Sequence, residues 1–271
     1  MRKLELTHLI SSLELSMPSI SVIIITKNEE LHIRDCIKSV QGVANEVIVV
    51  DSKSDDKTVQ IAESLGAKVT ITEDWQGFGL QKNKALSLAK CDWVLSIDAD
   101  ERLTPDLAKE IQSVLINEPK EDGFLITRKS WYCGKLIHHS GWQNDKVLRL
   151  FRRGSAVFTD SRVHEKLNML EDSKLKELGG LMLHYSFADY EEVLDKINRY
   201  STLWATEQLS RGKKSTPSRA VLHGIGAFIK TYIFKLGFLD GFHGLTLAVS
   251  NAEGAYYKYI KLWHLGQKSQ N

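Results

Sequence analysis

The fold is decided by the stretch SISVIIITKNEE, residues 19–30. Its first part, residues 19–26, is a run of mostly β-branched apolar residues, which is typical of a strand buried on both faces of a parallel sheet. The rest of the stretch is polar and acidic. We therefore expect a buried strand that ends in a loop rich in hydrogen-bonding groups.

The same alternation of strand and helix continues to about residue 118. We expect further strands at residues 46–50, 67–71 and 92–97, and helices at 31–40, 55–65 (capped by Asp55), 79–89 and from Thr104-Pro105 onward. Strands and helices that alternate this regularly predict an α/β fold with a doubly wound, mainly parallel, Rossmann-like sheet.

The remaining chain differs in character. We interpret residues 1–17 as a leader and 18–210 as a catalytic domain, divided into a ligand-binding half (18–118) and an α+β acceptor half (119–210). The acceptor half is expected to hold strands at 123–129 and 146–151 and a helix at 190–209. Residues 211–271 form a basic, apolar tail of amphipathic helices.

Composition excludes several classes of protein. Lys and Arg number 36 against 34 Asp and Glu, so the net charge of +2 argues against a nucleic-acid partner. Cys36, Cys91 and Cys133 are too scattered for a disulfide framework or a zinc site, which favours a reducing, cytosolic compartment. Neither a secretory signal nor an apolar run long enough to span a bilayer is visible, so any membrane contact is expected to be peripheral.

Polar residues follow the predicted strands at 26–30, 51–56 and 98–101. Ligands of doubly wound sheets bind at the carboxyl ends of the strands, so we expect one site there. The Gly-rich loops of nicotinamide dehydrogenases and P-loop kinases are absent. Asp98 and Asp100 are spaced so that both carboxylates can approach one hard cation, with diphosphate oxygens and waters completing its shell.

Taken in order, SVIIITKNEE (21–30), VIVVDS (47–52), SDDKT (54–58), residues 77–85 and DADE (98–101) resemble family 2 glycosyltransferases of the GT-A fold. Val163-His164-Glu165 and KLGFLDG (235–241) resemble, more narrowly, lipopolysaccharide core glucosyltransferases that act on inner-core heptose. The resemblance implies an inverting transfer of a sugar, with glucose the expected one, from a UDP-sugar to a heptose of the lipid A-core acceptor.

The resemblance also implies roles for individual residues. Uracil and ribose would be held by Thr26, Asn28, Glu29, Asp51 and Ser52, and Lys82 beside Asn83 would face the diphosphate. Asp100 would bind Mg²⁺ or Mn²⁺, with Asp98 touching ribose or metal and His184 as a third ligand. Ordinary roles stay open: turn or cap residues for Thr26 and Asn28, a capped strand end for Asp51, and a structural histidine for His184.

Inversion requires one base that deprotonates the acceptor hydroxyl. Glu165 is the candidate, with Asp160 and Glu171 as alternatives and a plain surface glutamate as the other interpretation. His164 could orient either the base or a phosphate, and the sequence leaves its role open.

The tail carries cations without acids between Gln208 and Leu239, namely Arg211, Lys213, Lys214, Arg219, Lys230 and Lys235. One helical face is expected to gather Val221, Leu222, Ile225, Phe228, Ile229, Tyr232 and Ile233. We predict that residues 211–264 contact the cytoplasmic face of a membrane. The alternative is a helix packed on the catalytic domain.

Other functional classes remain to be weighed. A sugar nucleotidyltransferase would need a Gly-rich basic loop after the first strand, where this chain has Thr26-Lys27-Asn28-Glu29. A non-catalytic membrane-binding module would leave the acidic loops unexplained. A family 2 transferase with another donor or acceptor is the nearest alternative.

Overall fold

The computed structural model describes residues 18–268 except 74, 76 and 161–164. The predicted leader and the Val163-His164 pair therefore lie outside the described residues. The chain forms two compact units. We call them the sheet unit, Met1–Thr127 with Lys146–Met182, and the helical unit, Arg128–Asp145 with Leu183–Asn271.

The first half of the sheet unit alternates as its sequence predicts. Its strands are β1 (Ile20–Thr26), β2 (Glu46–Asp51), β3 (Lys68–Ile71), β4 (Trp93–Ser96) and β5 (Glu101–Leu103), and its helices are α2 (Ile33–Val40), α3 (Thr58–Ser64), α4 (Phe78–Leu88) and α5 (Pro105–Ile116). Thr104 caps α5 as expected, because its side chain accepts a hydrogen bond from the Leu107 amide.

One predicted cap is wrong. Helix α3 begins at Thr58, and the Asp56 carboxylate, not that of Asp55, accepts hydrogen bonds from the Thr58 amide at 2.9 Å and the Thr58 hydroxyl at 2.5 Å. The Asp55 amide instead donates to the Asn28 side chain at 3.0 Å. Asp55 thus belongs to the strand-end loop and not to the helix.

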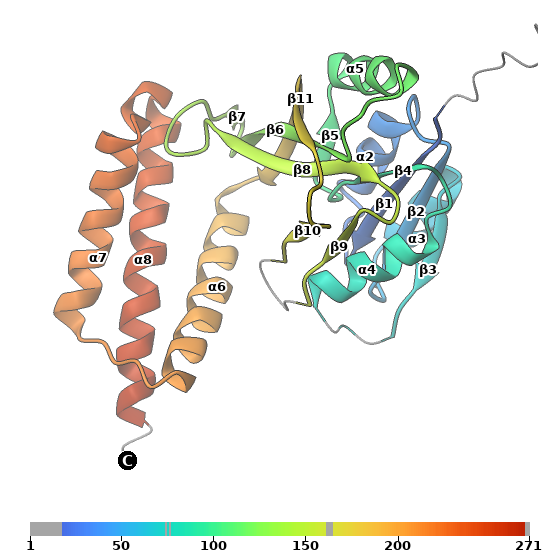
Figure 1. The fold of residues 1–271 in the computed structure, drawn as a ribbon. Coiled ribbons are helices and arrows are strands. Elements are labelled where there is room, and N and C mark those ends of the chain that lie inside the picture. Colours follow the sequence, from blue (N-terminus) through green and yellow to red (C-terminus); the bar gives the residue numbers. More distant parts are fainter. Residues whose placement is uncertain (1–17, 74, 76, 161–164, 269–271) are drawn as a thin grey trace, which may run out of the picture. The chain divides into compact units, whose positions relative to one another are not determined.

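The sheet follows the order β3-β2-β1-β4-β8-β6-β11-β5, with β7 beside β6 (Figure 1). Strand β1 runs parallel to β2 and β4, and β2 runs parallel to β3. Strand β8 is antiparallel to β4, so the direction changes where the second half of the sheet begins. The predicted doubly wound, mainly parallel sheet is confirmed, and it brings the ends of β1, β2 and β4 to one edge.

The second half of the sheet contains β6 (Gly123–Tyr132), β7 (Lys135–Leu136), β8 (Asp145–Arg152) and β11 (Leu175–Phe187), and β9 (Ala156–Phe158) pairs with β10 (Leu167–Met169) in a separate ribbon. Strands β6 and β8 were predicted, whereas the long strand β11 was missed. Its Gly179-Gly180 pair reads as a break, but Gly180 is needed for close packing, because a Cβ there would lie 2.6 Å from the Leu107 Cα.

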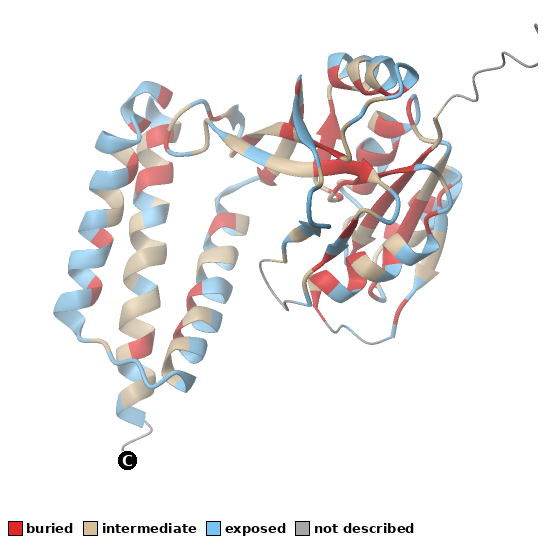
Figure 2. Cartoon of the chain, viewed as in Figure 1, coloured by how far each residue is buried: buried red, intermediate tan, exposed pale blue. Residues whose placement is uncertain are grey.

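The core of the sheet unit lies on both faces of β1 and β4 (Figure 2). On one face Val22, Ile24 and Leu95 pack with Ile33 and Ile37 of α2. The other face carries Ile23 and Val94 with Ala85 of α4. A strand that is apolar on both faces needs helices on both, which explains the continuous apolar run that decides the fold.

The helical unit contains α6 (Tyr190–Ser210), α7 (Pro217–Ile229), a π-helical turn η1 (Lys230–Phe234), a 3₁₀ turn η2 (Gly237–Asp240) and α8 (Phe242–Lys268). Helices α6 and α7 both pack against α8 (Figure 1). The single helical face predicted through Ile233 is wrong only for its last two residues, Tyr232 and Ile233, because α7 ends at Ile229 and these two lie in η1. None of the described helices combines the length and apolar character needed to cross a bilayer.

Candidate active site

The loops that follow β1 and β2 are joined by hydrogen bonds. Thr26 Oγ1 donates to Asp51 Oδ2 at 2.7 Å, and the Asn28 amide donates to Ser54 Oγ at 2.8 Å. Asn28 adopts a left-handed conformation with φ 57°, which asparagine tolerates better than most residues. The prediction that these two loops meet at one edge is confirmed.

Several of the predicted nucleoside ligands already have protein partners. Buried Asp51 accepts from Thr26 and also from the amide and hydroxyl of Ser54, at 2.7 and 2.6 Å. Ser52 Oγ accepts from Gln81 Nε2 at 2.6 Å, and the Glu29 amide donates to Thr58 Oγ1 at 2.7 Å. These contacts shape the loops, and the nucleoside contacts stay predictions.

The loop after β4 is held by the side chains of Glu101 and Arg102, for which the sequence pattern predicts no role. Fully buried Glu101 accepts the Asp98 amide at 2.9 Å through Oε2. Arg102 donates to the carbonyl oxygens of Ala99 and Glu101 at 2.7 and 2.8 Å. Because backbone groups on both sides of Asp100 are fixed, this loop presents its carboxylates from a defined backbone.

The Asp98 carboxylate lies between two cations. Lys82 Nζ is 2.9 Å from Oδ1, and Arg149 Nη2 is 2.6 Å from Oδ2. Burial opposes ionisation of Asp98, but Arg149 and Lys82 outweigh it and hold the pKa of this carboxyl well below its ordinary value. Asp98 is therefore an anion whose two oxygens are both fixed, while its side chain keeps 31% exposure.

Glu165 meets the same lysine. Lys82 Nζ lies 2.7 Å from Glu165 Oε1, so one ammonium group bridges Asp98 and the predicted base. Lys82 is almost fully buried, and it also lies over the Phe158 ring, 5.7 Å from its centroid. The alternative bases Asp160 and Glu171 are exposed.

Arg149 is the residue that sequence reasoning missed. It lies on β8, and its Nη2 contacts both Asp98 and Glu101 at 2.6 Å. Burial would lower the pKa of Arg149, but the two carboxylates outweigh it and raise the pKa. Its Nε is buried with no hydrogen-bond partner among the described residues. The available signal was an arginine flanked by apolar residues, Leu148 and Leu150, in the middle of a strand, since buried arginines are nearly always paired.

Asn83, the neighbour of Lys82, has a structural partner. Its side chain donates to the Phe158 carbonyl at 2.8 Å and accepts from the Phe158 amide at 2.9 Å. This pair of hydrogen bonds joins α4 to β9 and fixes the helix turn that carries Lys82.

The predicted metal ligands come from both units. Asp98 and Asp100 belong to the sheet unit, whereas His184 belongs to the helical unit, where Ser130 Oγ and Ser186 Oγ lie 3.1 and 2.9 Å from its Nδ1. Among the described residues, no three His, Cys, Asp or Glu side chains form a metal-binding group. Carboxylates that share a cation with substrate phosphates suit Mg²⁺. Both oxygens of Asp98 already contact Lys82 and Arg149, so a metal-binding role for Asp98 and Asp100 stays a prediction. The role of His184 stays a prediction.

Comparison with known proteins identifies the family of the chain. The family described as Glycosyl transferase family 2 matches residues 21–177. An uncharacterized glycosyltransferase of Rickettsia typhi is 35% identical over 269 residues, covering 94% of this chain and 90% of the relative. The lipopolysaccharide core biosynthesis glycosyltransferase LpsC of Rhizobium meliloti is 29% identical over 249 residues, covering 90% and 92% of the two chains.

Solved structures show a partial likeness. Glucosyl-3-phosphoglycerate synthase of Mycobacterium tuberculosis, in complex with Mn²⁺, UDP and glucosyl-3-phosphoglycerate, is 28% identical with a TM-score of 0.35. The likeness covers 42% of this chain and 44% of that one, which is less than half of either.

Proposed function

Because the chain belongs to glycosyl transferase family 2 and is a glycosyltransferase, we propose that it transfers a sugar from a UDP-sugar to a heptose of the lipopolysaccharide inner core, with inversion. Glucose is the proposed sugar. The acceptor class is supported by the likeness to LpsC over nearly the whole of both chains.

The observation that carries the proposal is the bridge formed by Lys82. Its ammonium group lies between Asp98, at the end of β4, and Glu165, on the segment after β9. A donor-side carboxylate and a base must be held close together if an acceptor hydroxyl is to attack a bound sugar. Fixed charges in a partly buried site need no reorganisation when the reaction occurs.

In this mechanism Glu165 takes the proton of the acceptor hydroxyl as its oxygen attacks the anomeric carbon from the face opposite UDP. Lys82 orients Glu165, and Arg149 with Glu101 orients Asp98. Asp100, with Asp98, would hold Mg²⁺ or Mn²⁺, which when bound neutralises charge on the departing diphosphate. UDP leaves readily, so a second acid is not needed.

The proposal includes a place in the cell. A lipid-anchored acceptor would bring the enzyme to a membrane, and the basic, acid-free stretch from Gln208 to Leu239 suits an anionic lipid surface. We propose peripheral association at the cytoplasmic face of the membrane.

A donor screen tests the function. Purified protein is incubated with UDP-glucose, UDP-galactose, UDP-N-acetylglucosamine and ADP-heptose, each with a heptose-terminated core oligosaccharide, with and without Mn²⁺ or Mg²⁺. We expect transfer from UDP-glucose, dependent on the cation. Transfer from another donor would correct the sugar, and a lack of transfer to any heptose-terminated acceptor would reject the acceptor class.

Asp100→Ala tests the metal assignment in the same assay. We expect transfer to fall at least about 100-fold, because loss of a Lewis acid that stabilises charge by several kcal/mol has an effect of this size. Asp106→Ala on the nearby helix α5 is the matched control and should keep full activity. Normal turnover by Asp100→Ala would remove Asp100 from the metal site.

A further inference from the structure

The segment KLGFLDG (235–241) has no role in the site described above. It forms most of the connection between α7 and α8 within the helical unit. We call residues 230–242 the apex: they run from η1 through η2 to the first residue of α8.

The inner side of the apex is tightly packed and hydrogen-bonded. Buried Asp240 accepts hydrogen bonds from the amides of His138 and His139 at 3.1 and 3.0 Å and from Ser140 Oγ at 2.9 Å. A Cβ on Gly237 would lie 2.8 Å from the Thr231 carbonyl oxygen, so the backbones touch directly. The apex is therefore a fixed turn anchored to residues 138–140.

The outer side of the apex is apolar and exposed. Phe234 is 76% exposed and Phe242 is 82% exposed, and four further large apolar residues of the apex are also exposed: Ile233, Leu236, Phe238 and Leu239. A rigid turn that displays two nearly bare phenylalanines costs free energy in water, and contiguous apolar patches of this kind mark interaction surfaces.

The charges near the apex indicate what covers it. Lys230 and Lys235 are exposed within the apex, and Lys135 Nζ donates to the Asp240 carbonyl at 3.0 Å. The one carboxylate of the apex, Asp240, is buried, and its oxygens accept hydrogen bonds from residues 138–140, so it does not face solvent. Exposed apolar side chains with exposed lysines among them suit the boundary between acyl chains and anionic headgroups.

We propose that the apex inserts into an anionic lipid surface, with Phe234 and Phe242 entering the acyl boundary and Lys230 and Lys235 meeting the headgroups. This deepens the proposed membrane association, on which it rests, by naming the side chains that make it. Helix α7 then stands away from the lipid surface and does not lie flat on it.

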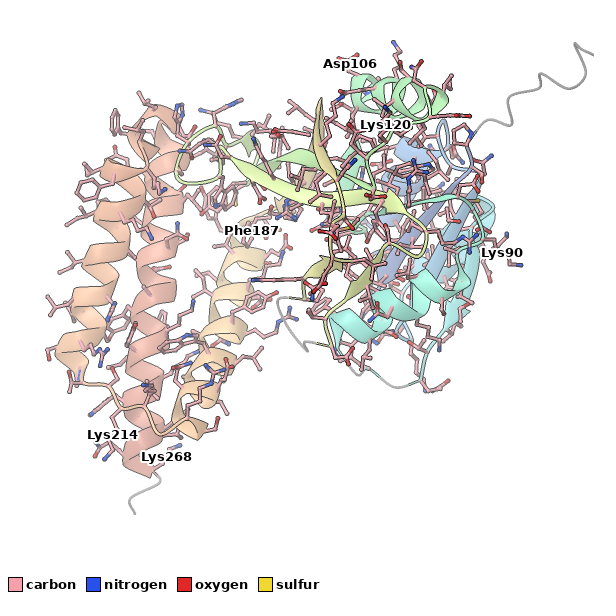
Figure 3. The ribbon with its side chains drawn as sticks, viewed as in Figure 1. Lys90, Asp106, Lys120, Phe187, Lys214 and Lys268 are labelled. Carbon is pink, nitrogen blue, oxygen red and sulfur yellow. The ribbon has the colours of Figure 1, made fainter. Side chains whose placement is uncertain are left out.

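The two orientations differ in which residues matter. Figure 3 places Lys214 and Lys268 at the end of the helix bundle opposite Phe187, and the apex lies at the Phe187 end. Helix α7 has 13 residues and so spans about 20 Å, well beyond a screening length of about 8 Å. With the apex inserted, Lys213 and Lys214 are too distant to feel the headgroups. A flat α7 would use them, together with Leu222, which is 68% exposed.

Vesicle co-sedimentation distinguishes insertion of the apex from a helix α7 that lies flat on the lipid surface. The full chain is mixed with phosphatidylcholine vesicles with and without 30% phosphatidylglycerol, about a third of the lipid, enough for a negative surface potential. We expect Phe234→Ser with Phe242→Ser to lower partitioning about 100-fold, since each buried phenylalanine contributes about tenfold. The matched control Leu222→Ser should stay within about twofold of wild type.

Charge reversal gives an independent comparison. Lys230→Glu with Lys235→Glu should lower binding to the anionic vesicles at least about tenfold, whereas Lys213→Glu with Lys214→Glu should change it less than about twofold. Far-UV circular dichroism and melting temperature check that each variant is folded, as expected for exposed positions.

Three results would overturn the proposal. The phenylalanine pair could bind vesicles as wild type does, Leu222→Ser could cost as much as that pair, or the wild type could be a dimer that dissociates in the pair variant and ignores vesicles. Transfer to a delipidated core oligosaccharide tests the proposed function independently of lipid binding by the apex. A wild type that binds vesicles through the apex but transfers nothing would leave this proposal standing and reject the proposed function.

Discussion

At the scale of single residues, Lys82 organises the candidate site. Its side chain is only 6% exposed, and it faces Asp98 at 31% and Glu165 at 15% exposure. A lysine this buried requires anionic partners, since an unpaired buried ammonium would be costly. The two carboxylates are therefore held in place by the same group.

Replacing Lys82 tests that role. In Lys82→Met the Glu165 carboxylate loses the cation that orients it, so we expect kcat to fall about 10- to 100-fold with a smaller change in acceptor KM. Lys82→Arg should recover part of the loss. Steady-state kinetics on both variants provide the measurement, and a fall in thermal stability with unchanged kcat would contradict a positioning role.

The pKa of Glu46 makes the stability of the folded protein depend on pH. Burial would raise its pKa, but hydrogen bonds from Lys68 and Ser21 and from the Lys90 amide lower it from 4.5 to about 2. A lowered pKa in the folded state contributes stability above about pH 4.5, and that contribution disappears as the pH falls toward 2.

We therefore expect Glu46→Gln to lower the free energy of unfolding by about 1–2 kcal/mol at pH 7, with the difference from wild type closing near pH 2. Urea unfolding across this range provides the measurement. Glu177→Gln is the control: its pair with Lys146 is exposed at both ends, so it should change stability by less than about 0.5 kcal/mol at pH 7. A Glu46→Gln difference that did not vary with pH would contradict the linkage.

Sequence alone could identify Thr26, Asp51 and Asp98 as residues of one edge, because each lies at or just past the end of an apolar strand. It could not identify the pairing of Arg149 with Asp98, since the two come from strands far apart in the chain. It also could not reveal that the Asp51 carboxylate accepts hydrogen bonds from Thr26 and Ser54, because those bonds depend on how two loops meet.

At the scale of elements, the turn into α8 depends on a glycine. A Cβ on Gly244 would lie 1.8 Å from the Gly237 carbonyl oxygen, a distance that no packing allows. Gly244→Ala should therefore shift α8 away from η2 and lower the free energy of unfolding by about 1–3 kcal/mol.

Gly226 provides the contrast. It lies inside α7, and a Cβ there would meet nothing within 4 Å. Gly226→Ala should raise the free energy of unfolding by about 0.5–1 kcal/mol, because alanine favours the helix. Denaturant unfolding of both variants is the measurement. Equal effects of the two substitutions would show that the close contact at Gly244 does not matter.

The elements that sequence predicts best have a local signal. Strands β1, β2 and β4 each contain a short apolar run, and α5 begins with the Thr104-Pro105 signature. Strand β11 was missed because Gly179-Gly180 interrupts its pattern for a tertiary reason. The end of α7 was missed because the π-helical turn keeps an apolar sequence while it changes the helical spacing.

At the scale of the whole molecule, the compact units do not follow the predicted functional division at residue 210. Helix α6, which precedes that boundary, packs on α8 and belongs to the helical unit. Strands β6, β8 and β11 carry the chain from one unit to the other. Sequence patterns detect elements, whereas the grouping of elements depends on contacts between distant segments, which periodicity does not report.

The central claim is that Glu165 is the base of a transfer reaction whose donor is held at the edge formed by β1, β2 and β4. The most direct measurement compares Glu165→Gln with wild type in single-turnover transfer from UDP-glucose, alongside calorimetric binding of UDP. For Glu165→Gln we predict a transfer rate at least about 1,000-fold lower, with the Kd for UDP unchanged within about threefold. The reason is that the substitution replaces the basic carboxylate by an amide of nearly the same shape, which cannot accept the proton. An unchanged transfer rate would contradict the account.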